Sequence, residues 1–579
     1  MNRLFLAITI LFLTISCNID NVLTGDLAPE ITFENNNGVF RVKQGRTITI
    51  SPKYNNVENA QYCWSQGSEV LSTEPELVYS NDIVGQYYIT LTVTTPSAQE
   101  QRDLRIDVVE LEIPWVSLPN AEEGFIISTD SELRLNPSVK DCSIETAFCW
   151  YIDDTPVSQE QNYIFSSEVT GEFAGKFVAR NEDGADSLSF AIAVCLHEDL
   201  PMGWSFNQTE YNYSSGRSIK ISPAEIINGE DAIFCWFVDG ELVQEDTIPY
   251  YICSISEEGT YTITATASRQ MGTSEAELSQ TLTVNVLPQE GQFYRPKSAT
   301  SQARFDKIYE YTPAPGQFIN DILSSGFSGV ESTMEEAVGY AQQRLGEDIW
   351  ISLGGFGGYI VAGFDHSVDC TGGYDLAISG NSFDGASEPG IVWVMQDENG
   401  DGRPNDTWYE LRGSETGAAE TIYDYAVTYY RSTSSGMDVQ WTDNQGCSGE
   451  IEYLKQYHNQ DFYFPSWIKE DKYTLRGTRL QAKNYDSSGN GAIWVLPPYD
   501  WGYVDNNSSI DLLGGENSAE GNPSMNLFKI SNAIDYAGNP LNLAYIDFVK
   551  IQCGVNAKSG WVGETSTEVS GIYDYNSMQ

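Results

Sequence analysis

The feature that most constrains this fold is a short motif that recurs three times at one spacing. An aromatic residue, a cysteine and a tryptophan follow one another, and 86 residues separate consecutive copies: Tyr62-Cys63-Trp64, Phe148-Cys149-Trp150 and Phe234-Cys235-Trp236. Each copy is followed by a glycine with an aromatic residue two positions later, at Gly85, Gly171 and Gly259. These glycines begin runs in which apolar and polar residues alternate, as strands with one buried face do. A fixed period of this kind indicates tandem copies of one domain.

A unit of this length with a central tryptophan strand is typical of β-sandwiches of the Ig or PKD type. We therefore predict an all-β chain with three tandem Ig/PKD-like β-sandwiches, then a larger mainly-β, jelly-roll-like domain with one or two short helices. The predicted boundaries are 26–110, 111–197 and 198–288 for the three repeats and 289–579 for the C-terminal module. No catalytic group recurs with the period, so we interpret the repeats as a spacer; carbohydrate or protein binding is the alternative.

The cysteines of the repeats lie beside tryptophans. Neighbouring residues of a strand face opposite sides of a sheet, so each cysteine must point away from the core that its tryptophan enters. An exported chain permits disulfides, and the candidates are Cys235–Cys253 and a pair among Cys142, Cys149 and Cys195. No pair has C-x-x-C spacing, so neither a zinc site nor a thioredoxin-type motif is indicated.

The first seventeen residues resemble the signal peptide of a bacterial lipoprotein. Arg3 supplies a positive charge, residues 4–15 are apolar, and Ser16 precedes Cys17. The apolar run is too short to span a bilayer. We expect a lipid on Cys17 and an outer-membrane, lipid-anchored location with exposure at the cell surface, where the lipid is the only membrane contact. An ordinary secretory signal is the alternative.

The charge balance excludes some classes of partner. The chain carries 31 Lys and Arg against 82 Asp and Glu, a net charge of −51. A nucleic-acid-binding protein needs a basic surface that replaces the counterions of the phosphates, so we expect no nucleic-acid partner. Docking on anionic lipid headgroups through charge is disfavoured for the same reason.

One helix is predicted in the C-terminal module. A capping box at Thr333 and Glu336 begins it, and Gly346 ends it. Its apolar stripe consists of Met334, Val338, Ala341 and Leu345. The remaining segments of the module predict short strands, among them 349–353, 359–365, 374–378, 388–394 and 546–551.

An acidic loop at residues 397–406 begins as calcium-binding loops do. Oxygen-bearing side chains alternate along it, and a glycine allows the sharp turn. The candidate ligands of a structural calcium ion are Asp397, Asn399, Asp401, Arg403 and Asp406. The twelfth position is Trp408 instead of the bidentate Glu of an EF-hand, and a plain polar turn is the alternative interpretation.

No enzyme class is indicated. The chain contains no G-x-S-x-G, H-E-x-x-H or P-loop motif and only three histidines. Among so many acids, a carboxylate pair of a glycoside-active enzyme is not excluded, but no pair stands out. We expect no catalytic residue.

Aromatic loops are the better candidates for a functional surface. The stretches 457–458, 462–467 and 498–503 are unusually aromatic for loops, and flat rings at the end of a sandwich stack on sugars or on a planar macrocycle. The alternative is that half of these rings cap the core. The candidate ligand-binding residues are His366, His458, Trp441, Tyr463, Trp467, Tyr499, Trp501 and Tyr503.

Two resemblances extend these expectations. The strand order of the module, with a Gly-Gly turn at 357–358, an Asn-x-Phe turn at 381–383 and a Glu-Pro strand start at 388–389, resembles galactose-binding-like jelly rolls. The runs 357–366, 397–410, 441–446, 500–503 and 560–569 are similar to Bacteroidetes cell-surface lipoproteins with PKD-like repeats, and this resemblance implies cobalamin-binding lipoproteins of the BtuH type.

The resemblance implies a non-catalytic lipoprotein that captures a corrinoid (vitamin B12), as a ligand and not as a cofactor. It also implies an outer-membrane TonB-dependent transporter as the partner that receives the ligand. A corrinoid would be held by aromatic faces and amide side chains, and His366 or His458 could coordinate its cobalt. The alternative functions are a glycan- or protein-binding adhesin or structural protein and, third, a glycoside-active enzyme.

Overall fold

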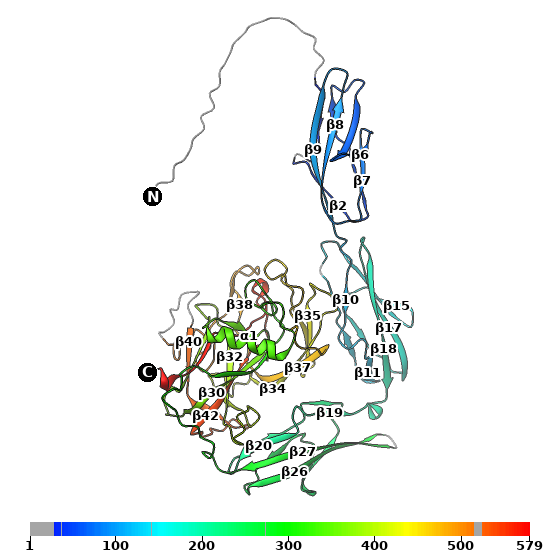
Figure 1. The fold of residues 1–579 in the computed structure, drawn as a ribbon. Coiled ribbons are helices and arrows are strands. Elements are labelled where there is room, and N and C mark those ends of the chain that lie inside the picture. Colours follow the sequence, from blue (N-terminus) through cyan, green and yellow to red (C-terminus); the bar gives the residue numbers. More distant parts are fainter. Residues whose placement is uncertain (1–27, 36, 141, 272–273, 514–523, 579) are drawn as a thin grey trace, which may run out of the picture. The chain divides into compact units, whose positions relative to one another are not determined.

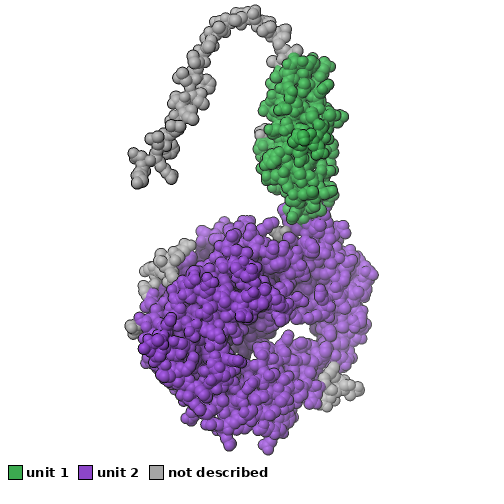
Figure 2. All heavy atoms as spheres, in the orientation of Figure 1, with its two compact units in different colours: residues 1–112 green, residues 113–579 purple. Residues whose placement is uncertain are grey.

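The computed structural model describes residues 28–35, 37–140, 142–271, 274–513 and 524–578. The chain divides into two compact units, residues 1–112 and 113–579 (Figure 2). The predicted all-β class is confirmed: strands dominate, and α1(Met334–Gly346) is the one α-helix in the described ranges (Figure 1). Within those ranges, no helix is long and apolar enough to span a membrane.

The first repeat is a sandwich of one large and two small sheets. Its five-stranded sheet has the order β2(Val39–Lys43), β9(Gln99–Val109), β8(Gly85–Thr94), β5(Gln61–Gln66), β6(Glu69–Ser72). The small sheets pair β3(Thr47–Ile50) with β7(Leu77–Ser80) and β1(Glu30–Thr32) with β4(Lys53–Asn55). Strand β2 runs parallel to β9, whereas the other pairs are antiparallel.

The second and third repeats have the same strand order. In the second it is β11(Phe125–Ser128), β18(Ala185–Cys195), β17(Gly171–Arg180), β14(Ala147–Ile152), β15(Thr155–Ser158). In the third it is β20(Glu210–Ser214), β27(Ser274–Leu287), β26(Gly259–Met271), β23(Ile233–Val238), β24(Glu241–Asp246). Small antiparallel sheets again complete each sandwich: β12(Leu133–Leu135) with β16(Tyr163–Phe165), β10(Val116–Ser117) with β13(Ser138–Val139), β21(Ile219–Ile221) with β25(Tyr251–Cys253), and β19(Gly203–Ser205) with β22(Glu225–Ile227).

The repeated tryptophans are the centres of the three sandwich cores. Trp64, Trp150 and Trp236 are completely buried, and the cysteine before each one is only partly buried. This confirms that the two neighbours face opposite sides of the sheet. Cys235 and Cys253 are free thiols, so the disulfide considered for this pair does not form; Cys149 and Cys195 are free as well.

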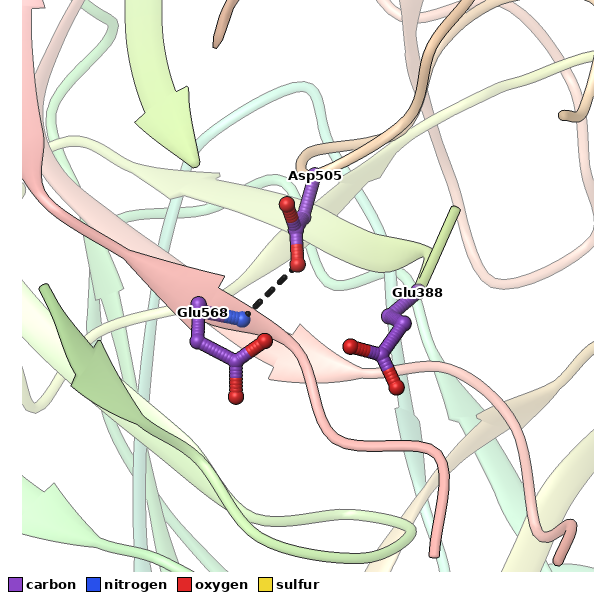
Figure 3. A group of neighbouring side chains, drawn as sticks. All are labelled: Glu388, Asp505 and Glu568. Carbon is purple, nitrogen blue, oxygen red and sulfur yellow. Dashed lines mark hydrogen bonds between the residues drawn. The ribbon is translucent and has the colours of Figure 1, made fainter. Parts of the chain in front are cut away.

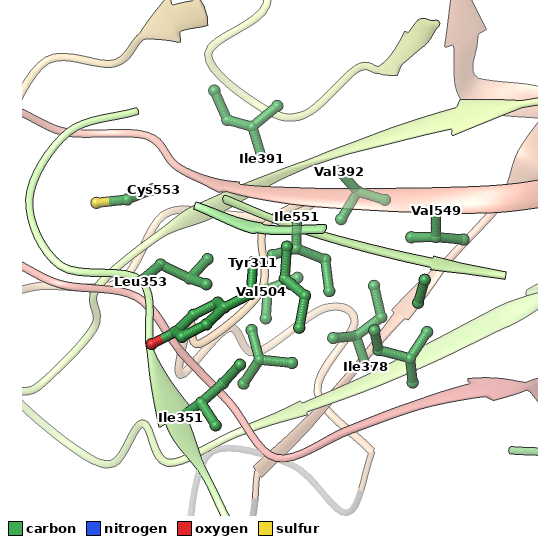
Figure 4. Packing of buried hydrophobic residues seen from close by; sticks show 14 of the residues in the cluster. Tyr311, Ile351, Leu353, Ile378, Ile391, Val392, Val504, Val549, Ile551 and Cys553 are labelled. Atoms are coloured by element: carbon green, nitrogen blue, oxygen red, sulfur yellow. The ribbon is translucent and has the colours of Figure 1, made fainter. Parts of the chain in front are cut away.

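The C-terminal module is built on a six-stranded antiparallel sheet. Its order is β28(Lys307–Thr312), β30(Tyr359–Asp369), β42(Tyr545–Cys553), β32(Gly390–Met395), β33(Tyr409–Leu411), β41(Ala533–Ile534). One face packs on a three-stranded sheet, β40(Ser524–Phe528), β31(Leu376–Gly380), β44(Gly571–Asp574). Ile378, Val549 and Ile551 meet in the shared core (Figure 4).

Further small sheets surround this sandwich. A four-stranded sheet has the order β36(Ser448–Ile451), β35(Val439–Asp443), β34(Ile422–Tyr430), β37(Lys472–Arg479). Two short ladders pair β29(Ile351–Ser352) with β43(Glu568–Val569) and β38(Tyr485–Asp486) with β39(Trp494–Val495). Single 3-10 turns are η1(His197–Asp199), η2(Ile530–Asn532), η3(Gly560–Val562) and η4(Tyr575–Ser577).

Helix α1 begins and ends where its sequence signals predict. Thr333 and Glu336 form the reciprocal capping box, and the helix ends at Gly346. The buried face differs in part from the predicted stripe, since it consists of Ala337, Tyr340, Ala341 and Leu345. Met334, the first residue of the helix, is exposed.

The second and third repeats contact the C-terminal module inside the second unit. Lys472 Nζ pairs with Glu123 Oε2 at 2.8 Å, and Gln440 Nε2 donates to the carbonyl of Asn136 at 2.9 Å. Arg217 Nη1 of the third repeat lies 2.6 Å from Glu398 Oε1 of the module. These two repeats are therefore integrated with the module, which differs from the free spacer expected from the sequence.

Candidate functional site

One end of the module carries an exposed pair of aromatic rings. We call this end, formed by residues 453–464, 482–499 and 555–566, the loop end. Trp561 is 50% exposed and Tyr457 is 57% exposed, and their ring centroids lie 5.9 Å apart with an angle of 43° between the planes. We call these two rings the aromatic platform. Large apolar surfaces left in water mark sites of interaction, and aromatic faces bind flat ligands by stacking.

The platform is held rigidly by its neighbours. The indole N–H of Trp561 donates to the carbonyl of Ala492 at 3.1 Å, which fixes the edge of the ring and leaves its faces available. Asn484 Nδ2 donates to the carbonyl of Lys558 at 2.8 Å and holds the preceding residues. Gly560 has a φ of +56°, and a Cβ there would lie 2.3 Å from the indole nitrogen of Trp494. Glycine thus allows the loop to pack directly on Trp494.

The pocket at the loop end is too small for a ligand. Lys483, Asn484 and Thr565 are among its lining residues, and its volume is about 10 Å³. This volume holds about one water molecule. A ligand of the loop end would therefore lie on the surface of the platform and not in this pocket.

Three carboxyl groups meet at the base of the loop end. Glu388 precedes β32, Asp505 lies in the loop after Tyr503, and Glu568 begins β43 (Figure 3). One oxygen of each lies within 4.8 Å of the others, which is close enough to share a metal ion. Asp505 Oδ2 accepts from the backbone N–H of Glu568 at 3.0 Å, and Glu388 Oε1 accepts from that of Ser566 at 3.2 Å. We call these three residues the carboxylate trio.

Burial and mutual repulsion favour the protonated forms of the trio. Burial raises the pKa of Asp505 to about 7. Burial, reinforced by the charge of Asp505, raises the pKa of Glu388 well above its usual value. Burial together with the charges of both neighbours has the same effect on the pKa of Glu568. Asp505 and Glu568 are closed off from solvent, which disfavours direct contact with a substrate such as a glycoside.

Four of the aromatic residues predicted to bind ligand are buried in the core, and the expectation of exposed rings is wrong for them: Tyr463, Trp467, Tyr499 and Tyr503. Two of these side chains can be buried because their hydroxyls have hydrogen-bond partners. The Tyr463 hydroxyl donates to the carbonyl of His458 at 2.9 Å, and the Tyr499 hydroxyl donates to that of Gln481 at 2.6 Å. Trp441 is partly buried against the same core, and Trp501 is partly buried in its loop. The alternative that these rings cap the core describes most of them.

Both candidate histidines are engaged by carboxylates. His366 is buried, with Nδ1 2.5 Å from Asp365 Oδ1 and Nε2 3.0 Å from Asp574 Oδ2. His458 Nδ1 lies 3.1 Å from Asp321 Oδ2, and its ring packs edge-on against Phe318. His366 is therefore closed to a ligand, whereas His458 is engaged through Nδ1 and is only partly buried beside Tyr457.

The acidic loop at residues 397–406 folds as a series of side-chain turns. Asp397 Oδ2 accepts from the N–H of Gly402 at 3.0 Å, Asn399 Oδ1 from that of Asp401 at 2.9 Å, and Asp401 Oδ1 from that of Arg403 at 2.8 Å. The second carboxylate oxygens of Asp397 and Asp406 are buried without a hydrogen-bond partner. Burial raises the pKa of Asp406 to about 7 and also raises that of Asp397.

Some relevant residues were not predicted as site residues. Trp561 stands between glycines in the segment 560–563, outside any alternating pattern, and that isolation is the signal that could have marked it as exposed. The carboxylate trio has no local signal, because its members lie far apart in the sequence. Cys17, the predicted lipid attachment point, lies outside the described residues.

Comparison with known protein families supports the assignment of the repeats as PKD-like domains. The family model of the PKD-like domain matches residues 28–95 and 114–181, in the first and second repeats. The match does not cover the third repeat, which nevertheless has the same strand order. PKD/Ig-like repeats are thus confirmed, and they are consistent with a non-catalytic surface or structural protein. None of the curated proteins is detectably similar to the chain.

Solved structures of tandem β-sandwich proteins are similar to part of the chain. The I67–I69 fragment of titin is 14% identical and aligns over 45–46% of this chain and 99% of its own, with a TM-score of 0.22. Three N-terminal domains of the Hoc protein of bacteriophage RB49 give the same identity and score over 45% of this chain and 99% of theirs. Fibronectin(III)-like modules of Clostridium thermocellum CbhA are 14% identical over 30% of this chain and 97% of theirs, with a TM-score of 0.19.

Proposed function

We propose that the protein is a lipid-anchored, non-catalytic lipoprotein of the outer membrane that captures a corrinoid at the loop end and passes it to a TonB-dependent transporter. The observation that supports this proposal is the aromatic platform. Trp561 and Tyr457 are half-exposed, yet the hydrogen bond to Ala492 holds the indole in one orientation. A rigid exposed ring is preorganised for stacking, so little conformational entropy is lost on binding.

A corrinoid suits the platform by shape and by polarity. Its flat macrocycle can rest on the rings, and its amide fringe can form hydrogen bonds with the exposed segment 486–491, which is rich in Ser and Asn. Coordination of cobalt by His366 is not part of the proposal, because its ring is buried and both of its nitrogens face carboxylates; His458, which is engaged through Nδ1 alone, stays a candidate ligand. Stacking and amide hydrogen bonds carry the recognition.

Titration of the full chain with cyanocobalamin, followed by the visible spectrum, tests this proposal. We expect saturable binding at micromolar concentration and an affinity about tenfold weaker for Trp561→Ala, which corresponds to ~1.4 kcal/mol of lost stacking. Trp115→Ala is the matched control, because this exposed tryptophan lies in the second repeat. The absence of binding at 100-fold higher corrinoid concentration, or equal losses in both variants, would contradict the proposal.

A glycan- or protein-binding adhesin is the second candidate function. The angle of 43° between the two rings favours it, since a twisted sugar chain can stack on two tilted faces that a single plane cannot cover equally. An array of glycans probed with the same two variants separates the candidates. Glycan binding that depends on Trp561 in a protein that ignores cyanocobalamin would favour the adhesin.

We further propose a structural calcium ion in the loop of residues 397–406. Two buried carboxylate oxygens, one from Asp397 and one from Asp406, lack partners that a cation would supply. We expect calcium to raise the melting temperature of the full chain by several degrees relative to EDTA, and Asp406→Asn to remove this shift.

Asp535→Asn is the matched control for calcium binding. Asp535 also forms a tight turn, but its oxygens accept from the N–H groups of Ala537 and Asn539 and from Asn539 Nδ2. Its replacement should leave the calcium effect unchanged. A melting temperature that is the same in calcium and in EDTA would contradict the proposed ion.

A further inference from the structure

The six-stranded sheet has a second face on which buried residues, among them Phe548 and Gln552, lie beside partly exposed charged and aromatic ones. Strand pairing places Glu310 opposite Val361, Val361 opposite Lys550, Lys550 opposite Trp393, and Trp393 opposite Glu410. Directly opposed residues of paired strands project to the same face. One row across five strands therefore carries two glutamates, a lysine and a tryptophan, which we call the sheet-face row. The opposite face carries the apolar core, including Val392 and Ile551.

Lys550 occupies an aromatic environment without an anionic partner. Its ammonium lies 4.7 Å from the ring centroid of Trp393, 5.2 Å from that of Trp408 and 5.9 Å from that of Tyr359. Among the described residues, Lys550 forms no salt bridge, and the charges of Glu310 and Glu410 partly offset the effect of burial on its pKa. Burial lowers its pKa to about 8. The three rings and the lysine remain partly exposed.

The sheet-face row also contains hydrogen-bond donors and acceptors that have few or no partners within the chain. The indole N–H of Trp393 has no partner in the structure. Glu410 accepts from the Thr478 hydroxyl at 2.5 Å through Oε2 alone, and Glu310 accepts from the Tyr359 hydroxyl at 2.9 Å. A buried N–H without a partner costs roughly 1–3 kcal/mol, which a ligand could recover by accepting from it.

We propose that the sheet-face row, with Trp408 and Tyr359, binds a neutral carbohydrate. Sugar rings present C–H faces that stack on indoles and phenols, and their hydroxyls both donate to carboxylates and accept from an indole N–H or an ammonium. Two glutamates beside one lysine, in a chain of net charge −51, disfavour an anionic ligand. Val361 and Glu410 are buried, so the accessible part of the row runs from Glu310 to Trp393. This part spans three inter-strand spacings, or roughly 14 Å, so a short oligosaccharide fits it better than a single sugar.

This site is separate from the loop end, and its test distinguishes the two. The full chain is titrated by calorimetry with cello-, xylo-, manno- and galacto-oligosaccharides and with the corresponding uronic-acid oligomers. We expect at least one neutral oligosaccharide to bind, with affinity at least tenfold weaker in Trp393→Ala and in Trp408→Ala. Trp561→Ala and Trp115→Ala serve as matched controls and should bind as the wild type does.

The variant Lys550→Met tests the site without the risk of misfolding that the tryptophan variants carry. Methionine keeps most of the apolar stem, so the melting temperature should change little, whereas oligosaccharide affinity should fall at least threefold. In the wild type, affinity should also weaken above pH 8. Glu310 and Glu410 face the same ammonium, and burial raises the pKa of Glu410 to about 7, so the pH dependence should become smaller in Lys550→Met and what remains should be due to Glu410. Binding of uronic-acid oligomers alone, loss of binding only in Trp561→Ala, or no binding of any neutral oligosaccharide at millimolar concentration would overturn the proposal.

Discussion

Replacing Arg217 by methionine will destabilise the second unit by about 3–5 kcal/mol, the usual cost of leaving a buried charge without its partner. The Arg217 guanidinium lies between Glu398 Oε1 at 2.6 Å and Glu290 Oε2 at 3.2 Å, and its carbon lies 5.7 Å from the ring centroid of Tyr409. Glu398 also accepts from the hydroxyl and the backbone N–H of Ser214. The ion pair therefore fastens the third repeat to the module.

Urea unfolding monitored by tryptophan fluorescence measures this effect, and limited proteolysis reports whether the third repeat separates first. Arg134→Met is the matched control, because Arg134 is exposed and its contact with Glu132 is long, at 3.8 Å, so we expect a change of at most about 0.5 kcal/mol. The double variant Arg217→Met/Glu398→Met removes both charges and should recover most of the stability. A double variant as unstable as Arg217→Met would show that the unpaired charge of Glu398 does not cause the loss of stability.

Raising the pH from 5 to 8.5 will lower the free energy of unfolding of the second unit by roughly a few kcal/mol, since each pKa unit corresponds to about 1.4 kcal/mol. Burial holds the pKa of Asp505 at about 7 and that of Glu564 at about 8 in the folded state. In the unfolded chain both return to ordinary carboxyl values, near 4. The folded state therefore binds more protons across this window. The stabilisation that the protonated Asp505 and Glu564 give the folded state is full below pH 4 and is lost as the pH rises through 7 to 8.

Melting curves of the full chain at half-unit pH steps test this dependence. Glu568→Gln removes one charge from the carboxylate trio and should flatten the pH profile, whereas Glu241→Gln, an exposed position on β24, should leave it unchanged. Carboxyl groups with a lowered pKa, such as Asp321 and Glu331, lose their stabilisation only below their usual pKa, so they do not affect the chosen window. Stability that stays constant or rises between pH 5 and 8.5 would contradict the expectation.

Regular local patterns allowed much of the fold to be predicted. The spacing of Trp64, Trp150 and Trp236 identified the repeats because each sandwich needs one large residue at the same depth. The capping box at Thr333 identified α1 because its hydrogen bonds span only three residues. Such signals involve neighbours in the sequence, so no knowledge of the tertiary fold is needed to read them.

The candidate sites could not be read in the same way. Tyr463 and Tyr499 occur in segments that look like exposed aromatic loops, but their rings close the core and their hydroxyls find backbone carbonyls. Composition cannot separate these residues from Trp561, because burial depends on which segments pack over them. The sheet-face row combines five strands from Glu310 to Lys550, and only the strand order brings its members into line.

The parallel pairing of an early strand with the last strand gives each repeat a mechanical property. In the first repeat β2 and β9 align side by side from Val39 opposite Arg105 to Lys43 opposite Val109, and β11 with β18 and β20 with β27 do the same. Because the two strands run in the same direction, tension on opposite ends of a repeat acts along them and loads their hydrogen bonds in shear. All bonds of the pair must then break together instead of unzipping one at a time. Each sandwich thus resists stretching along its strands.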